Sequence, residues 1–366
     1  VLSVCTENKR AIINQDGVKT LLSILLTTSN TNTNTEHSTR VTHNCLYVIR
    51  NCSNLATDLQ NEYIDSLIKL LIDHLTDTDA IYVQCAVGIL CNLTCNNQHN
   101  KSLCVQSNGV EALVRTLIQS SDENVVEPAV CALRHITSRH LYAQHAQESI
   151  RLAYGIPTVV RFISTTSSCA LIKATAGLVR NLAVSASNIL PLRENGVLTR
   201  LVSLIRNLMK RPNPRSSHAV VIESCLGALH SLIQSSCSNR ITFRDTDGFD
   251  MLAELAVTDT HSLKVQRTAI LTLSELVCEN HDDQDIDTNT ICAKKLTNIQ
   301  GFVNKINNIA NSQTTLSAIA TPIIQSILHT TNNNNNNNKT NSPHSSKRTI
   351  NSRDQQQPNA WFDTDL

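Results

Sequence analysis

The feature that most constrains this chain is a unit of sequence that returns along it at intervals of roughly 41–53 residues. Seven such units can be laid over one another. A period of this size is typical of proteins built from helical repeats, in which the units stack into one continuous array. We predict that the longer helix of each unit begins near Gly17, Tyr63, Gly109, Gly155, Gly196, Gly248 and Gly301.

Each unit opens with a small or polar residue, a glycine and an amphipathic run. Apolar residues then follow at helical spacing, as in Val110, Leu113 and Leu117. We expect the glycine to end a short preceding helix in a left-handed conformation, so that the chain turns sharply into the next helix. This opening occurs at Asp16-Gly17, Asn108-Gly109, Asn195-Gly196 and Asp247-Gly248.

A third helix closes each unit. The predicted third helices span residues 44–53, 85–95, 128–138, 173–184, 224–233 and 267–277. Three glycines precede a shared polar position by one helical turn, where a missing side chain would let a ligand backbone approach; they are Gly88, Gly177 and Gly227. We call that shared position the ladder, and it is occupied by Asn51, Asn92, His135, Asn181, Ser231 and Glu275.

The composition favours an all-α fold. Aromatic residues are only 3% of the chain, and Leu, Ile, Val and Ala supply the apolar share, which suits short helices stacked through aliphatic seams. The net charge of +1 gives no global attraction to nucleic acid or an anionic membrane. No signal peptide or membrane-inserting stretch is predicted.

The 13 cysteines contain no Cys-x-x-Cys pair, and most lie in apolar helical runs. They therefore predict reduced, buried thiols. Cys91 and Cys95 could share a helix face, but no His or carboxylate completes a four-ligand zinc set around them. We expect neither a metal nor a cofactor.

Four parts follow one another along the chain. Residues 1–15 read as the end of a preceding repeat, 16–288 as repeats, 289–329 as a degenerate terminal repeat or cap, and 330–366 as a disordered Asn-rich tail. Residues 29–39 read as an expanded loop in the first full repeat. The sequence starts without Met inside an apolar run, so we expect that an N-terminal part of the protein is missing.

The third helices of such a stack line its concave side, and the ladder there forms a groove. An Asn amide both donates and accepts hydrogen bonds, so it can hold the backbone of an extended peptide. Acidic residues are scarce on these helices until Glu275, which favours an acidic, extended partner. The positive charges beside the ladder are Arg50, Lys101, Arg134, Arg139, Lys173 and Arg180.

Several segments resemble the β-catenin/plakoglobin family, which includes the fly Armadillo protein. They are ILCNLTCNNQHNK (89–101), EPAVCALRHITSRH (127–140), LIKATAGLVRNLA (171–183) and PLRENGVLTRLV (191–202), and the terminal AWFDTDL (360–366) resembles the end of β-catenin. The resemblance implies an all-α fold, an armadillo-repeat right-handed superhelical solenoid with a disordered C-terminal tail.

The resemblance also implies a scaffold. Its groove would bind acidic extended segments of cadherin tails, TCF/LEF transcription factors and an APC-type scaffold, in cell adhesion and in Wnt signalling with transcriptional coactivation. The implied locations are the cytoplasm, the adherens junction and the nucleus. Contacts to α-catenin and axin would be made only through the missing N-terminal part.

The family's groove residues map onto this sequence one by one. A family lysine that pairs with a ligand aspartate corresponds to Lys101, and its neighbouring contacts correspond to Asn92 and Asn96. Tyr47 stands where the family usually has Trp. The family's long acidic C-terminal region is replaced by polar residues, which favours adhesion over transcriptional activation. The other implied groove residues are Arg50, Asn51, Arg134, His135 and Lys173, and the ladder itself adds Arg180 and Asn181.

The C-terminus carries its own signal. Thr364, Asp365 and Leu366 offer a hydroxyl, an apolar last side chain and a free carboxylate, the features that a PDZ domain reads when a peptide adds to its sheet.

Three other readings fit less well. An importin-like cargo receptor pairs each ladder Asn with a Trp four residues earlier, and here only Tyr47 before Asn51 approaches that pattern. An enzyme is not predicted, because no nucleophile elbow, phosphate loop or carboxylate pair accompanies the histidines. Direct nucleic-acid binding is not predicted, because no aromatic residues interleave the basic strip.

Overall fold

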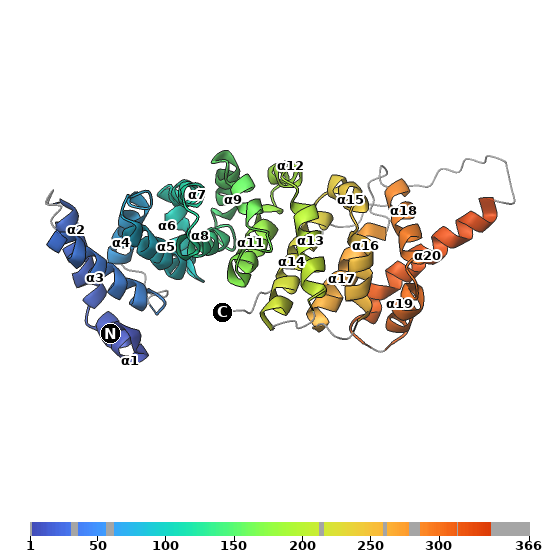
Figure 1. Cartoon of the computed structure of the whole chain (residues 1–366), viewed down its shortest axis with the longest axis horizontal. Coiled ribbons are helices and arrows are strands. Elements are labelled where there is room, and N and C mark those ends of the chain that lie inside the picture. The colour runs from blue at the N-terminus through green and yellow to red at the C-terminus, as the bar shows by residue number, and fades with distance from the viewer. Residues whose placement is uncertain are drawn as a thin grey trace.

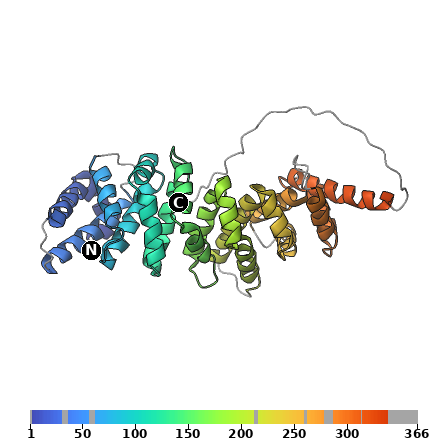
Figure 2. The ribbon, with the colours of Figure 1, turned by 90° about the horizontal axis from the view of Figure 1, so that it is seen from above.

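A computed structural model describes residues 2–30, 36–55, 62–211, 216–258, 262–277, 286–312 and 314–337. These residues form twenty α-helices and one 3₁₀ turn, η1 (Leu2–Val4), with no strand among them. The helices stand side by side in one elongated row, and the chain passes along this row once from its N-terminal to its C-terminal end (Figures 1 and 2). The predicted all-α array of repeats is confirmed.

Each complete repeat has three helices in the same order. The short first helices are α1 (Thr6–Asn14), α6 (Gln98–Gln106), α9 (Ala143–Leu152), α12 (Ala186–Glu194), α15 (Cys237–Arg244) and α18 (Ile286–Thr297). The second helices are α2 (Gly17–Asn30), α4 (Glu62–Asp73), α7 (Gly109–Gln119), α10 (Gly155–Arg161), α13 (Val197–Met209), α16 (Gly248–Val257) and α19 (Phe302–Ala310). The third helices are α3 (Glu36–Ser53), α5 (Ala80–Thr94), α8 (Glu123–Ile136), α11 (Cys169–Leu182), α14 (Ser216–Gln234), α17 (Leu263–Val277) and α20 (Ser317–Asn337).

The third helices begin four to eight residues earlier than their apolar pattern predicts. At α5 and α8 a side-chain cap supplies the missing start signal. The Asp79 carboxylate accepts hydrogen bonds from the backbone N–H groups of Ile81 and Tyr82, and the Asp122 carboxylate accepts one from Asn124. Because these caps satisfy donors that the helix cannot, the first, polar turn is stable without apolar residues of its own.

The turn into the second helix uses glycine in two ways. Gly196 has a φ of 71°, the left-handed conformation expected there. At Asn108-Gly109 the residue before the glycine is left-handed instead, with a φ of 57°. Gly109 is needed there for space, because a Cβ on it would lie 2.7 Å from the Cys104 carbonyl oxygen. The same exchange of roles occurs at Asp16-Gly17 and Tyr154-Gly155.

The core runs along the whole row. Consecutive third helices pack against one another from α3 to α20, and the second helices cover them from one side. The residue directly after the ladder position is fully buried in each of the six third helices that carry a ladder residue, which turns the polar side of the same helix toward the groove. These buried residues are Cys52, Leu93, Ile136, Leu182, Leu232 and Leu276.

Two predicted boundaries differ from the structure. Helix α20 continues past residue 330 to Asn337, so the predicted tail begins inside a helix. A helix anchored by the buried Ala320, Ile323 and Ile327 can extend through polar residues at little cost, since each added residue gains a backbone hydrogen bond. The predicted loop at 29–39 is helical at both ends, because α2 reaches Asn30 and α3 starts at Glu36.

No single helix in the described ranges is long and apolar enough to cross a membrane. The consecutive helices α14 and α15 are long and apolar enough only when taken together, and the chain bends by 119° between them.

Candidate functional site: a basic groove along the third helices

The ladder side chains tie neighbouring repeats together. Asn92 Nδ2 donates to the Ser53 hydroxyl of the preceding third helix at 2.9 Å. Asn181 Nδ2 donates to Thr137 Oγ1 at 3.0 Å and to the Arg134 carbonyl oxygen at 2.9 Å. The same link joins Asn51 to Ser3 and His135 to Thr94. The ladder is therefore a series of inter-repeat hydrogen bonds.

This arrangement narrows what a ladder amide can offer a ligand. Its N–H group is already bonded within the chain, whereas in the described part of the chain no donor is bonded to Oδ1 of Asn92 or Asn181. A peptide lying along the groove would therefore meet these two amides as hydrogen-bond acceptors. From the sequence alone, these amides were predicted to act toward a peptide both as hydrogen-bond donors and as acceptors.

The structural role of the ladder predicts a stability effect. Asn181→Ala should lower the free energy of unfolding by about 1–2 kcal/mol, because it removes two hydrogen bonds between α8 and α11. Urea denaturation followed by circular dichroism measures this loss. Asn207→Ala, at an exposed position of α13, is the control and should change stability by less than about 0.5 kcal/mol. Equal effects of the two substitutions would contradict this role.

The glycines before the ladder do not leave space for a ligand. A Cβ on Gly88 would lie 2.7 Å from Nε of Arg50, and a Cβ on Gly177 would lie 2.6 Å from Cδ of Arg134. The arginine of each preceding repeat therefore covers the glycine of the next. The prediction that a ligand backbone approaches these glycines is wrong, because a long side chain of this protein already fills the space.

Gly227 differs, since a Cβ there would lie 4.0 Å from Nη1 of Arg180. Gly227→Ala should raise the free energy of unfolding by about 0.5–1 kcal/mol through helix propensity. Gly177→Ala should gain less or lose stability, because its Cβ would displace Arg134. Urea denaturation of both variants compares them directly, and equal gains would show that Arg134 does not rest on Gly177.

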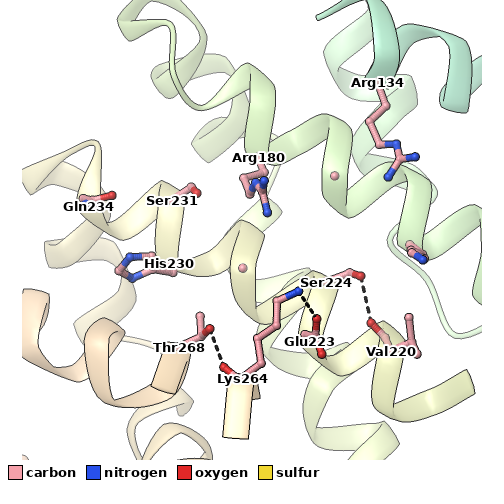
Figure 3. Close-up of a pocket in the computed structure, with 13 residues that line it drawn as sticks. Arg134, Arg180, Val220, Glu223, Ser224, His230, Ser231, Gln234, Lys264 and Thr268 are labelled. Carbon is pink, nitrogen blue, oxygen red and sulfur yellow. Dashed lines mark hydrogen bonds and ion pairs between the residues drawn. The ribbon is translucent and has the colours of Figure 1, made fainter. Parts of the chain in front are cut away.

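A hollow of ≈ 140 Å³ opens between α8, α11, α14 and α17 (Figure 3). Four cationic side chains and one carboxylate, Glu223, line it. Glu223 forms an ion pair of 2.7 Å with Lys264. The uncharged polar residues that line the hollow include Ser224, His230, Ser231, Gln234 and Thr268. The cations are Arg134, Lys173, Arg180 and Lys264.

Three of these cations were predicted from the sequence, and the structure brings them together. Lys264, Gln234 and Glu223 were missed. Glu223 is one of the few acidic residues on these helices before Glu275, where they were expected to be scarce. Aligning the repeats could have identified Glu223. It lies eight residues before the ladder in α14, at the position that Lys173 occupies in α11.

A second cluster joins Lys101, Arg134 and His135. Lys101 on α6 is only 4% exposed, and its Nζ donates to the Ser138 carbonyl oxygen at 3.1 Å. Burial, and then the nearby Arg139, lowers the pKa of the Lys101 ammonium. Burial, followed by Arg134 and Lys101, lowers the pKa of His135 to about 4.

His135 is therefore neutral at physiological pH, and its contacts define the tautomer. Arg134 Nη2 donates to His135 Nε2 at 3.4 Å, so Nε2 is the acceptor. The proton then lies on Nδ1, which points to Thr94 Oγ1 at 3.4 Å. The charge of this cluster comes from Lys101 and Arg134 alone, and it is uncompensated: neither residue has a carboxylate within ion-pair distance in the described ranges.

The remaining predicted residues lie outside the hollow. Arg50 and Asn51 belong to α3 at the N-terminal end of the row, and Tyr47 on the same helix is 43% exposed. Asn96 is exposed in the turn after α5, with a φ of 54°. The predicted PDZ ligand, Thr364, Asp365 and Leu366, falls outside the described residues.

Comparison with known proteins places this geometry in a family. Residues 97–138, from α6 to α8, match the Armadillo/beta-catenin-like repeat. Junction plakoglobin of Xenopus laevis is 38% identical over 303 residues, which are 78% of this chain and 39% of that protein. Catenin beta of Tripneustes gratilla is 39% identical over 304 residues, 78% of this chain and 35% of that protein. The matched region thus spans well under half of these relatives.

Solved structures agree on the fold. A structure from work on a conserved phosphorylation switch that controls the interaction between cadherin and beta-catenin has a TM-score of 0.74 and 25% identity, covering 89% of this chain and 64% of that chain. A designed armadillo repeat protein, YIII(Dq)4CqI, has a TM-score of 0.58 and 17% identity, covering 71% of this chain and 99% of that chain. The chain is therefore a member of the β-catenin/plakoglobin family, built as an array of armadillo repeats.

Proposed function

We propose that the groove along α5, α8, α11, α14 and α17 binds acidic, extended protein segments, in particular cadherin cytoplasmic tails and TCF/LEF-type factors. The observation that carries this proposal is the charge of the hollow, where four cations face one carboxylate. Arg134 and Lys173 have no carboxylate within ion-pair distance in the described part of the chain. Anionic side chains of a ligand would supply the missing partners.

The choice of partners rests on the relatives. The similar structure from work on cadherin and beta-catenin supports a cadherin tail. The plakoglobin and catenin relatives support a place at cell junctions. TCF/LEF factors, an APC-type scaffold and a nuclear role in Wnt signalling extend the proposal by the same charge argument. Contacts to α-catenin and axin would need residues beyond this sequence, and a PDZ protein would bind the C-terminus.

Titration of the chain with acidic cadherin-tail and TCF-type peptides tests this proposal. Peptides of the same lengths with every Asp and Glu replaced by Lys are the matched controls. We expect the acidic peptides to bind, more weakly as salt rises, and the basic peptides not to bind. Binding of both acidic peptides supports both roles, and binding of the cadherin peptide alone supports a junctional role. Failure of both acidic peptides to bind would overturn the proposal.

The same experiment decides against the importin-like alternative. A receptor for basic cargo needs carboxylates in the groove, and the hollow presents four cations instead. Preference for the basic peptides would favour that alternative.

A further inference from the structure

The interlock of arginine and glycine along the groove is interrupted at one junction. The residue before the ladder is arginine in α3, α8 and α11, and each arginine faces a glycine of the next third helix. Between α5 and α8 both positions hold cysteine instead: Cys91 takes the arginine position and Cys131 takes the glycine position. The stacking that brings Arg50 onto Gly88 therefore brings one thiol onto another.

The pKa shifts agree with this stacking. The partner thiol is the largest cause of the shift at both Cys91 and Cys131. Both side chains are partly exposed, unlike the buried Cys45, Cys52 and Cys85. All the cysteines in the described residues are free. This pair thus combines proximity in the stack with partial exposure, which the fully buried thiols do not have.

The surroundings divide the pair into two chemical roles. The hydrogen bond from the Cys91 thiol, together with Arg134 and Lys173, lowers the pKa of Cys131. The same hydrogen bond and burial raise the pKa of Cys91. Since the thiolate is the nucleophile, Cys131 is the attacking sulfur and Cys91 remains a thiol beside it.

We propose that Cys91 and Cys131 are an oxidation site at which a hydroperoxide forms a disulfide between α5 and α8, and that this bond weakens the binding of acidic segments in the groove. The oxidation half of this proposal stands on the repeat register that stacks Cys91 on Cys131 and on the partial exposure of both thiols. The effect on binding rests on the proposed function of the groove.

The chemistry balances with one hydroperoxide. The Cys131 thiolate attacks the terminal oxygen, the O–O bond breaks, and the leaving alkoxide or hydroxide takes up a proton, which leaves a sulfenic acid on Cys131. The Cys91 sulfur then attacks that sulfur, and water leaves with the Cys91 proton. Two thiols are oxidised, the peroxide is reduced, and a thiol reductant restores the pair.

The bond would change the groove beside Arg134, one of the cations of the hollow. A disulfide holds its sulfurs about 2.05 Å apart, closer than two hydrogen-bonded thiols. Closing that distance draws α8 toward α5, and it moves Arg134 and His135, three and four residues after Cys131. An extended ligand spaced for the reduced groove would lose one charge-assisted hydrogen bond, which corresponds to about tenfold weaker binding.

The first measurement is covalent. The chain is treated with hydrogen peroxide, its remaining thiols are blocked, and a non-reducing digest is mapped by mass spectrometry. We expect a peptide pair joined through Cys91 and Cys131, absent after reduction and absent in Cys91→Ser and Cys131→Ser. Cys169→Ser and Cys237→Ser, at two other partly exposed thiols, are the matched controls and should leave the pair intact. No cross-link, or a cross-link between Cys91 and Cys95, would overturn the oxidation site.

The second measurement is functional. The acidic cadherin-tail peptide is titrated into the reduced and the oxidised chain, and into Cys131→Ser treated in the same way. We expect oxidation to weaken binding about tenfold in the parent and not in the variant. Equal binding of reduced and oxidised protein would overturn the regulatory half. Absence of binding in the reduced protein would refute the proposed groove function, while the cross-link result would still decide the oxidation site.

Discussion

Lys173→Glu should weaken binding of an acidic peptide by about 2–5 kcal/mol, or roughly thirtyfold to several thousandfold. Lys173 lies in the hollow beside Arg134 and Arg180, and no carboxylate of the described chain pairs with it. A ligand carboxylate there would lose its partner and would meet a like charge in a partly desolvated site. Isothermal titration calorimetry with the cadherin-tail peptide measures the change.

The control for this variant changes charge equally, but away from the groove. Arg200 is exposed on the second helix α13, and Arg200→Glu should alter affinity by less than about threefold at physiological salt, because the Debye length is then about 8 Å. Circular dichroism and urea denaturation establish that both variants are folded. Similar losses in the two variants would mean that net charge, and not the hollow, controls binding.

Stability should fall by about 3 kcal/mol between pH 7 and pH 4 through His230 alone. This side chain is 8% exposed, points toward Thr272 Oγ1 at 3.3 Å, and has a pKa lowered by burial to about 4. The folded protein keeps His230 neutral down to about pH 4, whereas the unfolded chain takes up the proton near pH 6.5. The unfolded state therefore binds more protons in that window, and the free energy of unfolding decreases as the pH falls.

Urea denaturation at several pH values measures this slope. His230→Gln should make the free energy of unfolding depend less on pH, whatever the substitution does to stability at pH 7. His135→Gln should reduce this pH dependence in the same direction. His145→Gln, at an exposed histidine, is the control. A slope that is unchanged in His230→Gln would show that this imidazole is not buried in the neutral form.

The sequence was sufficient for the repeat array, because periodicity reports which residues share a face. It located the second helices to within a residue or two, and three of the four cations that line the hollow were among the residues it singled out. It failed where a long side chain crosses between repeats. Nothing in the spacing of Gly88 or Gly177 shows that an arginine of the preceding repeat reaches them, because alignment compares equivalent positions and gives no distance between neighbours.

The same limit explains the other errors. Helices α5 and α8 start early because Asp79 and Asp122 cap them. A capping residue is a single-position signal, which is harder to recognise in a sequence than a repeated apolar pattern. Asn332 to Asn337 belong to α20 because tertiary packing of its first turns overrides the composition of its last ones. The opposing charges Glu223 and Lys264 lie on different helices, so their meeting depends on the stacking itself.

The arginine-over-glycine contacts and the ladder hydrogen bonds have a mechanical consequence. Each of these contacts joins only neighbouring repeats, so the interfaces between repeats can be stretched independently of one another. A pull along the row would first lift one arginine off its glycine and open the groove there, while the other interfaces keep their spacing. A ligand bound across several repeats would carry part of the applied force. Its affinity for the groove would in turn depend on that force.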